Sequence, residues 1–217
     1  MIATLRSATV AIVLATLALG LLYPLAVTGI GQVAFSGTAD GSLITRDGKT
    51  VGSSIIAQAF QKPVLDKAGK PKVDADGNAV TEPDPRYLQP RPSATGYAGD
   101  ATYFANRGPN SKAAAYAYRD AVAAVLAFER PYVPGLRAAD LPVDAVEDSA
   151  SGVDPHISTA NAQLQSYRIA AQRGIPRAKV LDLIEANTDG RALGVFGRPG
   201  VNVLEFNLAL DREAPAR

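Results

Sequence analysis

The chain begins with a long stretch that carries no charge. No Asp, Glu, Lys or Arg lies between Arg6 and Asp40, and residues 8–27 are apolar almost throughout. A helix of about twenty residues rises about 30 Å, which matches the hydrocarbon core of a bilayer. We therefore predict a transmembrane anchor helix over residues 7–30, with Pro24 bending or ending it near the far end.

A cleaved signal peptide is the alternative interpretation of this stretch. The apolar core of a signal peptide spans about 7–15 residues and is followed by a small-x-small cleavage site. Here the apolar run is longer, and the Ala-Val-Thr sequence at residues 26–28 is a poor cleavage site. We therefore favour a retained single-pass anchor.

The positive charges beside the apolar stretch predict its orientation. Arg6 and the amino terminus precede the stretch, and the next basic residue is Arg46. Basic residues are enriched on the cytoplasmic side of a span. We therefore expect residues 1–6 in the cytoplasm, the anchor in the cell inner (plasma) membrane, and residues 31–217 in the periplasm or outside the cell.

The composition argues against several kinds of chemistry. The 22 basic and 21 acidic residues are nearly balanced, which disfavours nucleic acid as a partner. Cysteine is absent and His156 is the only histidine, so neither a disulfide nor a typical zinc site is expected. The chain also lacks a Gly-x-Ser-x-Gly nucleophile elbow, and Leu43 replaces the first glycine needed for a phosphate-binding loop. We predict no catalytic residue and no metal site.

The first half of the exported domain reads as strands and loops. Asp47-Gly48 is a favoured two-residue hairpin turn. Residues 51–60 are expected to form the returning strand and a short helix. Residues 61–90 are rich in proline and predict a long surface loop with a small hairpin at residues 72–80.

Three helices are expected in the second half. Ser111 caps a helix over residues 112–129, Ser158 caps one ending near Gly174, and Pro176 opens a third that ends near Asn187. Their predicted buried stripes are Tyr118, Val122 and Val125 in the first helix, Ala160, Leu164, Tyr167 and Ala171 in the second, and Val180, Leu183 and Ile184 in the third.

The C-terminal residues predict strands. Residues 193–196 lead into a turn at residues 197–200, and alternate residues of 201–210 are large and apolar. Because strands and helices are grouped along the chain, the expected fold is a single α+β domain behind the anchor helix.

Several segments, taken together and in order, resemble one family. They are VGSSIIAQAF at residues 51–60, RPSA at 91–94, SASGVDPHIS at 149–158, RIAAQRG at 168–174, TDGR at 188–191 and VNVLEFNLALD at 201–211. This set resembles the C chain (KdpC) family of the Kdp potassium-transporting P-type ATPase. The chain departs from the family pattern across residues 61–110, and it has Arg198 where the family usually has glutamate.

The resemblance implies a set of signature residues with a role in assembly or in ATP affinity. They are Gln58, Arg91, Ser93, Ser151, Gly152, Asp154, Pro155, His156, Arg168, Arg173, Gly190, Arg191, Asn202 and Asn207. The residues themselves suggest a plainer role for some of this set. Residues 154–158 read as a turn that precedes a helix, and Arg168, Arg173 and Arg191 read as ion-paired surface groups.

The resemblance also implies a function without catalysis in this chain. Members belong to a high-affinity potassium uptake complex with a channel-like potassium-binding subunit (KdpA), a P-type ATPase subunit (KdpB) and a small membrane peptide (KdpF). The family is described as a catalytic chaperone that raises the ATP affinity of the ATPase subunit, with ATP bound through the complex. Because the predicted orientation separates this domain from cytoplasmic ATP, we favour coupling between distant sites. The alternative is a membrane-tethered exported binding or enzymatic domain unrelated to potassium transport.

Overall fold

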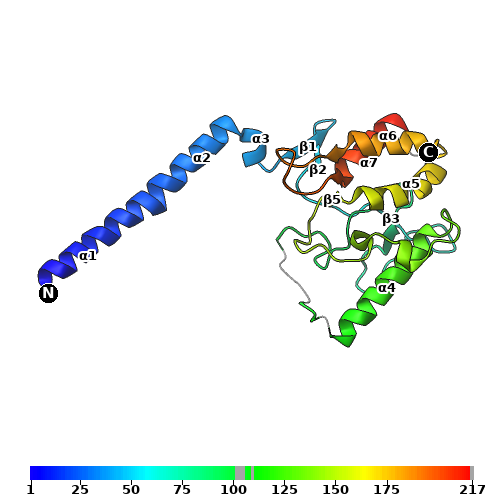
Figure 1. Cartoon of the computed structure of the whole chain (residues 1–217), viewed down its shortest axis with the longest axis horizontal. Coiled ribbons are helices and arrows are strands. Elements are labelled where there is room, and N and C mark those ends of the chain that lie inside the picture. Colours follow the sequence, from blue (N-terminus) through cyan, green and yellow to red (C-terminus); the bar gives the residue numbers. More distant parts are fainter. Residues whose placement is uncertain (101–105, 109, 216–217) are drawn as a thin grey trace. The chain divides into compact units, whose positions relative to one another are not determined.

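The computed structural model describes residues 1–100, 106–108 and 110–215. The chain divides into two compact units, Met1–Val51 and Gly52–Arg217, which are described separately. Figure 1 labels their helices and strands.

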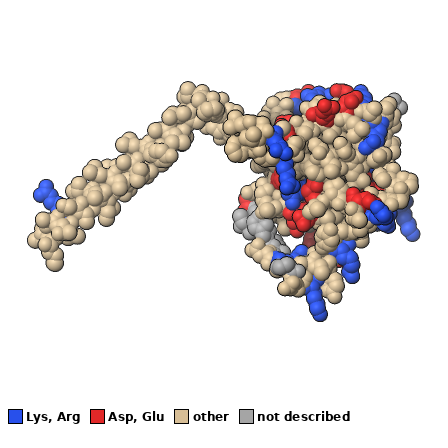
Figure 2. Space-filling model, in the orientation of Figure 1, with Lys and Arg blue, Asp and Glu red and all other residues tan. Residues whose placement is uncertain are grey.

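The first unit contains one long apolar helix. It runs from Ile2 to Ala34 as α1 (Ile2–Ala15), a π-helical stretch (Thr16–Leu22) and α2 (Tyr23–Ala34), and it is the one helix in the described residues long and apolar enough to cross a membrane. None of its residues is buried, and Figure 2 shows a rod almost free of charge.

The helix is longer than predicted, and it does not end near Pro24. Proline has no backbone N–H and its ring crowds the preceding turn. The wider π turn lies immediately before Pro24, where one regular helical hydrogen bond is lost, and such turns commonly absorb irregularities of this kind. The chain therefore remains helical through Pro24 and on to Ala34.

A hairpin follows the short helix α3 (Ser36–Ala39). Strands β1 (Leu43–Arg46) and β2 (Lys49–Ser53) form a two-stranded sheet. The connecting Asp47 and Gly48 have φ of 52° and 75°, as a type I′ turn requires. The predicted hairpin is confirmed, but the short helix expected within residues 51–60 is replaced by a turn.

Residues 61–83 form a largely exposed antiparallel excursion, and the small hairpin predicted at residues 72–80 is confirmed. Strand β3 (Gln61–Pro63) pairs with β4 (Thr81–Pro83), and isolated bridges continue the pairing toward turns at Gly69 and Gly77. The prediction of a surface loop over residues 61–90 is wrong for residues 84–90, which are buried or half-buried. Leu88 has no exposed surface and lies in the centre of the core.

The three predicted helices are present with the predicted caps. They are α4 (Lys112–Glu129), α5 (Thr159–Arg173) and α6 (Arg177–Ala186). Ser111 and Ser158 accept hydrogen bonds from the backbone N–H groups three residues later. Gly174 ends α5 with a φ of 64°, which glycine adopts without steric cost.

Two of the predicted buried stripes are wrong. In α4 only Leu126 and Glu129 are buried, whereas Tyr118 is exposed. In α5 the predicted stripe is exposed or half-buried. The face of α5 that is buried instead consists of Asn161, Ala162, Gln165, Ser166, Arg168, Ile169 and Ala170. An apolar pattern could not find this face because four of its members are polar. The stripe of α6 is confirmed.

The C-terminal segment is mostly helix, so its prediction as a strand is wrong. A three-stranded antiparallel sheet has the order β5 (His156–Ile157), β7 (Gly200–Asn202) and β6 (Thr188–Asp189). Helix α7 (Val203–Glu213) then begins where the side chain of Asn202 accepts a hydrogen bond from the Glu205 N–H. This cap outweighs the alternating apolar pattern of residues 201–210.

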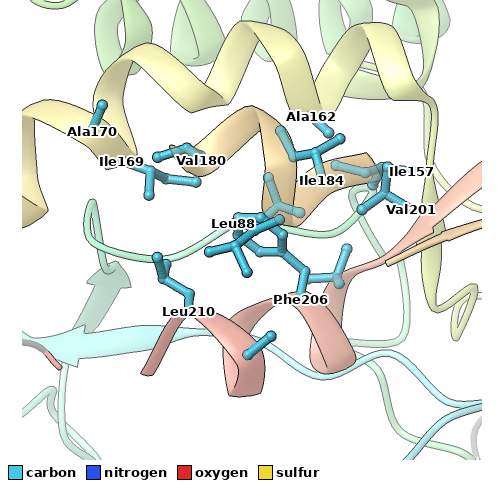
Figure 3. Close-up of a cluster of buried hydrophobic side chains, with 13 residues drawn as sticks. Leu88, Ile157, Ala162, Ile169, Ala170, Val180, Ile184, Val201, Phe206 and Leu210 are labelled. Atoms are coloured by element: carbon cyan, nitrogen blue, oxygen red, sulfur yellow. The ribbon is translucent and has the colours of Figure 1, made fainter. Parts of the chain in front are cut away.

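The core lies among α5, α6, α7 and the small sheet. Figure 3 shows Leu88 between α5 and α7, with Phe206 and Val180 nearby. The domain behind the anchor is therefore α+β, as predicted: helices packed with small antiparallel sheets.

Candidate functional site

The signature residues around residue 152 form a tight turn held by side chains. The Ser93 hydroxyl donates to the Gly152 carbonyl at 2.6 Å, and the Val153 N–H donates to the Ser151 hydroxyl at 3.2 Å. The backbone of Gly152 has a φ of 74°, which disfavours any residue with a Cβ. Three predicted signature residues, Ser93, Ser151 and Gly152, are therefore partners in, or next to, one turn. We call residues 149–157 the signature turn.

Asp154 and His156 tie the signature turn to the strands beside it. Asp154 accepts a hydrogen bond from the His156 N–H at 3.0 Å and lies 3.4 Å from an Arg91 guanidinium nitrogen. The His156 ring Nε2 lies 2.7 Å from a carboxylate oxygen of Asp189. The Pro155 carbonyl accepts from the Val203 N–H at 3.0 Å. The expected polar contact with the backbone ahead of the helix is present, but residues 156–157 are strand β5 rather than part of a turn. The segment also joins β5 to β6 and α7.

Tyr97 is joined to the same network through its backbone N–H, which donates to the Ser93 hydroxyl at 3.0 Å. The Tyr97 hydroxyl donates to the Arg91 carbonyl at 2.9 Å. Burial, with a smaller contribution from the charge of Asp148, raises the pKa of Tyr97 to about 12. Tyr97 is therefore a neutral structural hydrogen-bond donor at physiological pH.

Asn202 and Gln58 lie where the chain enters the domain. The Asn202 amide donates to the Ser54 carbonyl at 2.8 Å while its oxygen caps α7. A Cβ at Gly52 would lie 2.8 Å from the Gln58 amide oxygen and 2.6 Å from Leu204. A side chain at Gly52 would therefore collide with both neighbours.

The other signature residues hold residues 85–89 inside the core. Arg168 donates to the carbonyls of Pro85 and Tyr87, at 2.6 and 2.9 Å. Asn207 accepts from the Leu88 N–H and donates to the Leu88 carbonyl, both at 2.9 Å. The backbone of residues 85–89 is hydrogen-bonded as in a strand, but its partners are side chains rather than a neighbouring strand. We call it the braced segment.

Arg173 joins the braced segment to the C-terminal end of α7. It donates to the carbonyls of Arg86 and Ala214 and to a carboxylate oxygen of Asp211, and it stacks on the Tyr87 ring at 4.6 Å. Arg168 and Arg173 are ion-paired, as predicted, but their predicted place at the surface is wrong, because both side chains are almost completely buried. Their donors satisfy backbone carbonyls that water cannot reach.

Two signature residues lie outside these networks. Gly190 and Arg191 belong to an exposed loop between β6 and β7. Arg191 has no ion pair with a carboxylate in the described part of the chain. Residues 101–105 and 109, within the stretch predicted to depart from the family, lie outside the described residues.

Sequence reasoning missed two groups that complete the networks. Gln165 exchanges two hydrogen bonds with the backbone of Gln89, at 2.8 and 3.1 Å. Glu129 accepts from Arg168 at 2.9 Å, and burial, opposed by the Arg168 charge, raises the pKa of this carboxyl. A buried polar residue on a helix leaves no apolar signal, so neither could be found from periodicity.

The arrangement of the signature residues is suited to holding parts of the fold together rather than to catalysis or ligand binding. Arg91, Arg168 and Arg173 donate to acceptors on the chain itself, so no cradle for a triphosphate is formed from them. Within the described ranges no three His, Asp or Glu residues gather as metal ligands. An apolar hollow of about 520 Å³ lies between α4 and residues 89–97 and is lined mainly by proline, alanine and aromatic side chains.

We expect Gly152→Ala to destabilise the domain by about 2–4 kcal/mol, because it adds a steric collision to an unfavourable backbone conformation. A Cβ there would lie 2.7 Å from the Thr95 hydroxyl. Gly135→Ala is the matched control, since Gly135 has a φ of 82° but open space around a Cβ. Urea unfolding should show a loss of about 1 kcal/mol for the control. Equal losses for the two variants would contradict the collision.

Comparison with known proteins identifies the family. The family model of the K+-transporting ATPase C chain matches residues 5–212, nearly the whole sequence. The chain belongs to the KdpC family. The KdpC subunit of the potassium-transporting ATPase of Dechloromonas aromatica is 42% identical, over 95% of this chain and 96% of the relative. Those of Sorangium cellulosum and Caulobacter vibrioides are 41% and 42% identical, over 97% and 99% of this chain and 98% and 96% of the relatives.

Membership of the KdpC family decides between the functions left open above. A full-length match makes this chain a subunit of a potassium-transporting ATPase complex, and an exported domain unrelated to potassium transport is excluded. The family relationship and the single apolar helix together make it a membrane-anchored subunit.

Proposed function

We propose that this chain is a non-catalytic subunit that stabilises the assembled potassium pump from the outer face of the membrane. The anchor helix would lie beside the membrane subunits KdpA, KdpB and KdpF. The domain would bind the outer face of the channel-like subunit KdpA. One observation carries this proposal: most of the signature residues bond to one another and to the backbone, and so form a rigid platform rather than an open site.

The charge pattern supports the proposed orientation. Arg6 and the terminal amine flank the start of the helix, and the described helix reaches Ala34 without another charge. Placing these two positive groups in the cytoplasm puts the domain in the periplasm or outside the cell.

We propose that any effect on ATP affinity is exerted over a distance. The buried guanidinium groups of Arg168 and Arg173 are already bonded to the chain's own carbonyls and carboxylates. They could bind phosphate only if their bonds to the braced segment were broken. Binding of this subunit would instead favour the ATP-binding conformation of KdpB. Such coupling is typically 1–3 kcal/mol, or about 5–150-fold in affinity.

Co-purification from potassium-limited cells tests this function. The tagged chain, extracted in mild detergent, should recover a large potassium-binding subunit and a P-type ATPase. Asp154→Ala should lower the recovery severalfold, because it frees Arg91 and the His156 N–H together. Asp140→Ala, which removes an exposed pair with Arg137, should not.

Two outcomes would contradict the proposal. One is recovery of the tagged chain alone, folded and stable. The other is an Asp154→Ala complex that assembles fully but no longer pumps, since that would assign the signature turn a direct part in transport.

A further inference from the structure

A second surface of the domain is unlike the rest of it. The loop between β6 and β7 exposes three large apolar side chains: Leu193 at 89%, Val195 at 65% and Phe196 at 65%. The value for Leu193 is the highest of any large apolar side chain in the described residues of 52–217. Single exposed apolar residues are ordinary, but three within four residues form a patch of the kind that marks an interaction site with a protein or a membrane. We call this loop the apolar tip.

The apolar tip has a defined shape. Ala192 and Phe196 exchange two backbone hydrogen bonds of 2.9 Å, and further bonds join Gly194 to Arg191 and Val195 to Ala192. The φ of 53° at Leu193 and 76° at Gly194 closes the turn. Because the loop is already ordered, inserting it into another medium costs little conformational entropy.

Two arginines flank the apolar tip. Arg191 and Arg198 lie on either side of it in sequence, and neither has an ion pair among the described residues. An apolar insert between two cations matches a bilayer surface, where acyl chains lie beneath anionic phosphates.

The chain's own connections place the base of the apolar tip near the point where the chain enters the domain. It ends at β7, and Asn202 at the far end of β7 bonds Ser54, close to where the chain enters the domain. Three residues of strand span about 10 Å, so the base of the tip lies close to that point. Ile55 and Ile56, which follow Ser54, are also exposed.

The link to the anchor is short. Residues 35–51 separate the end of α2 from the second unit, and fully extended they would reach at most about 60 Å. Helix α3 and the β1–β2 hairpin shorten this reach further. The link therefore sets an upper limit on how far the point where the chain enters the domain can lie from the end of the anchor helix.

We propose that the apolar tip inserts Leu193, Val195 and Phe196 into the membrane interface while Arg191 and Arg198 bind anionic phospholipid headgroups. The domain is then held to the bilayer at a second point besides its anchor helix. The proposal depends only on the anchor, so it applies to either orientation of the chain and does not require the assembly role proposed above.

Fluorescence of the full chain in nanodiscs tests the proposal. The chain has no cysteine, so Val195→Cys provides a single site for an environment-sensitive NBD label. Val73→Cys is the matched control, since Val73 is equally exposed at 63% but lies in the hairpin excursion. In nanodiscs of equal phosphatidylglycerol and phosphatidylcholine, nitroxide-labelled lipids should quench the probe at 195 severalfold more strongly than the probe at 73.

Charge removal provides the second readout. Arg191→Gln and Arg198→Gln should each lower the ratio of inserted to free tip about fivefold, and nanodiscs of phosphatidylcholine alone should reproduce the combined loss. Both arginines are exposed, so these variants leave the core intact. Equal quenching at 195 and 73 would overturn the proposal. Protection of position 195 that appears only when the other pump subunits are reconstituted would also overturn it, because the tip would then dock on protein.

Discussion

Arg168→Met is expected to destabilise the domain by about 3–5 kcal/mol. The side chain has no exposed surface and bonds Glu129, Gln165 and the carbonyls of Pro85 and Tyr87. Its removal leaves a buried carboxylate without its counter-charge and two carbonyls without donors, which is the costly way to break a buried ion pair. Urea unfolding of the full chain in detergent, followed by circular dichroism, measures the loss.

The controls for this prediction separate the buried pair from charge in general. Arg119→Met removes an arginine that is 70% exposed and paired with Asp120, and it should change stability by less than about 0.5 kcal/mol. Arg168→Met combined with Glu129→Gln should recover more than about 1 kcal/mol relative to the single variant, because no uncompensated charge remains. If Arg168→Met were as stable as Arg119→Met, the bonds that Arg168 makes to the braced segment would not be needed for the stability of the domain.

Asn207→Leu is expected to cost about 2–5 kcal/mol, although leucine has a similar volume and is apolar. Asn207 is 1% exposed, and its amide supplies both hydrogen bonds of the Leu88 backbone. Leucine would bury a donor and an acceptor without partners, at about 1–3 kcal/mol each. The same unfolding measurement applies, and hydrogen exchange should show faster exchange of the Leu88 amide.

Gln163→Leu is the matched control for Asn207→Leu. It makes a similar exchange on the exposed face of α5, where no side-chain bond would be lost. It should change stability by less than about 0.5 kcal/mol. If Asn207→Leu were as stable as this control, the backbone of Leu88 would have to be satisfied in another way, and the account of the braced segment would fail.

The helices with local start and stop signals could be predicted closely from sequence. Ser111, Ser158 and Gly174 act within one turn of their own positions, so their meaning does not depend on the rest of the fold. The anchor helix was predictable for the same reason, since its signal is the absence of charge. Its full length was not, because the helix also includes residues 2–6 and 31–34, which lie beyond the stretch that a bilayer requires.

Elements that depend on tertiary contacts could not be predicted. The apolar residues of 201–210 alternate as in a strand, but the cap at Asn202 and the packing of Phe206 and Leu210 in the core make this segment a helix. The buried face of α5 was missed because its polar residues are there to bond the braced segment. The first error comes from giving the alternating pattern more weight than the cap, and the second from treating burial as a property of apolar residues alone.

The candidate site was predictable as a set of residues but not as an arrangement. The motifs located Arg91, Ser93, Asp154 and His156, and the structure joins all four to the signature turn or its neighbours. Nothing in the spacing indicated that Arg168 and Asn207 would belong to a second network around Leu88. Long-range pairs of this kind are set by topology, which one sequence does not reveal.

Cysteine labelling in intact cells tests the central proposal, the side of the membrane on which the domain lies. A single cysteine at Lys70→Cys lies at the end of an exposed turn of the domain, and one at Ala3→Cys lies in the first turn of the apolar helix, on the N-terminal side of Arg6. A membrane-impermeant maleimide should label position 70 at once and position 3 only after permeabilisation. The reverse pattern would place the domain beside cytoplasmic ATP and contradict a subunit that acts from the outer face.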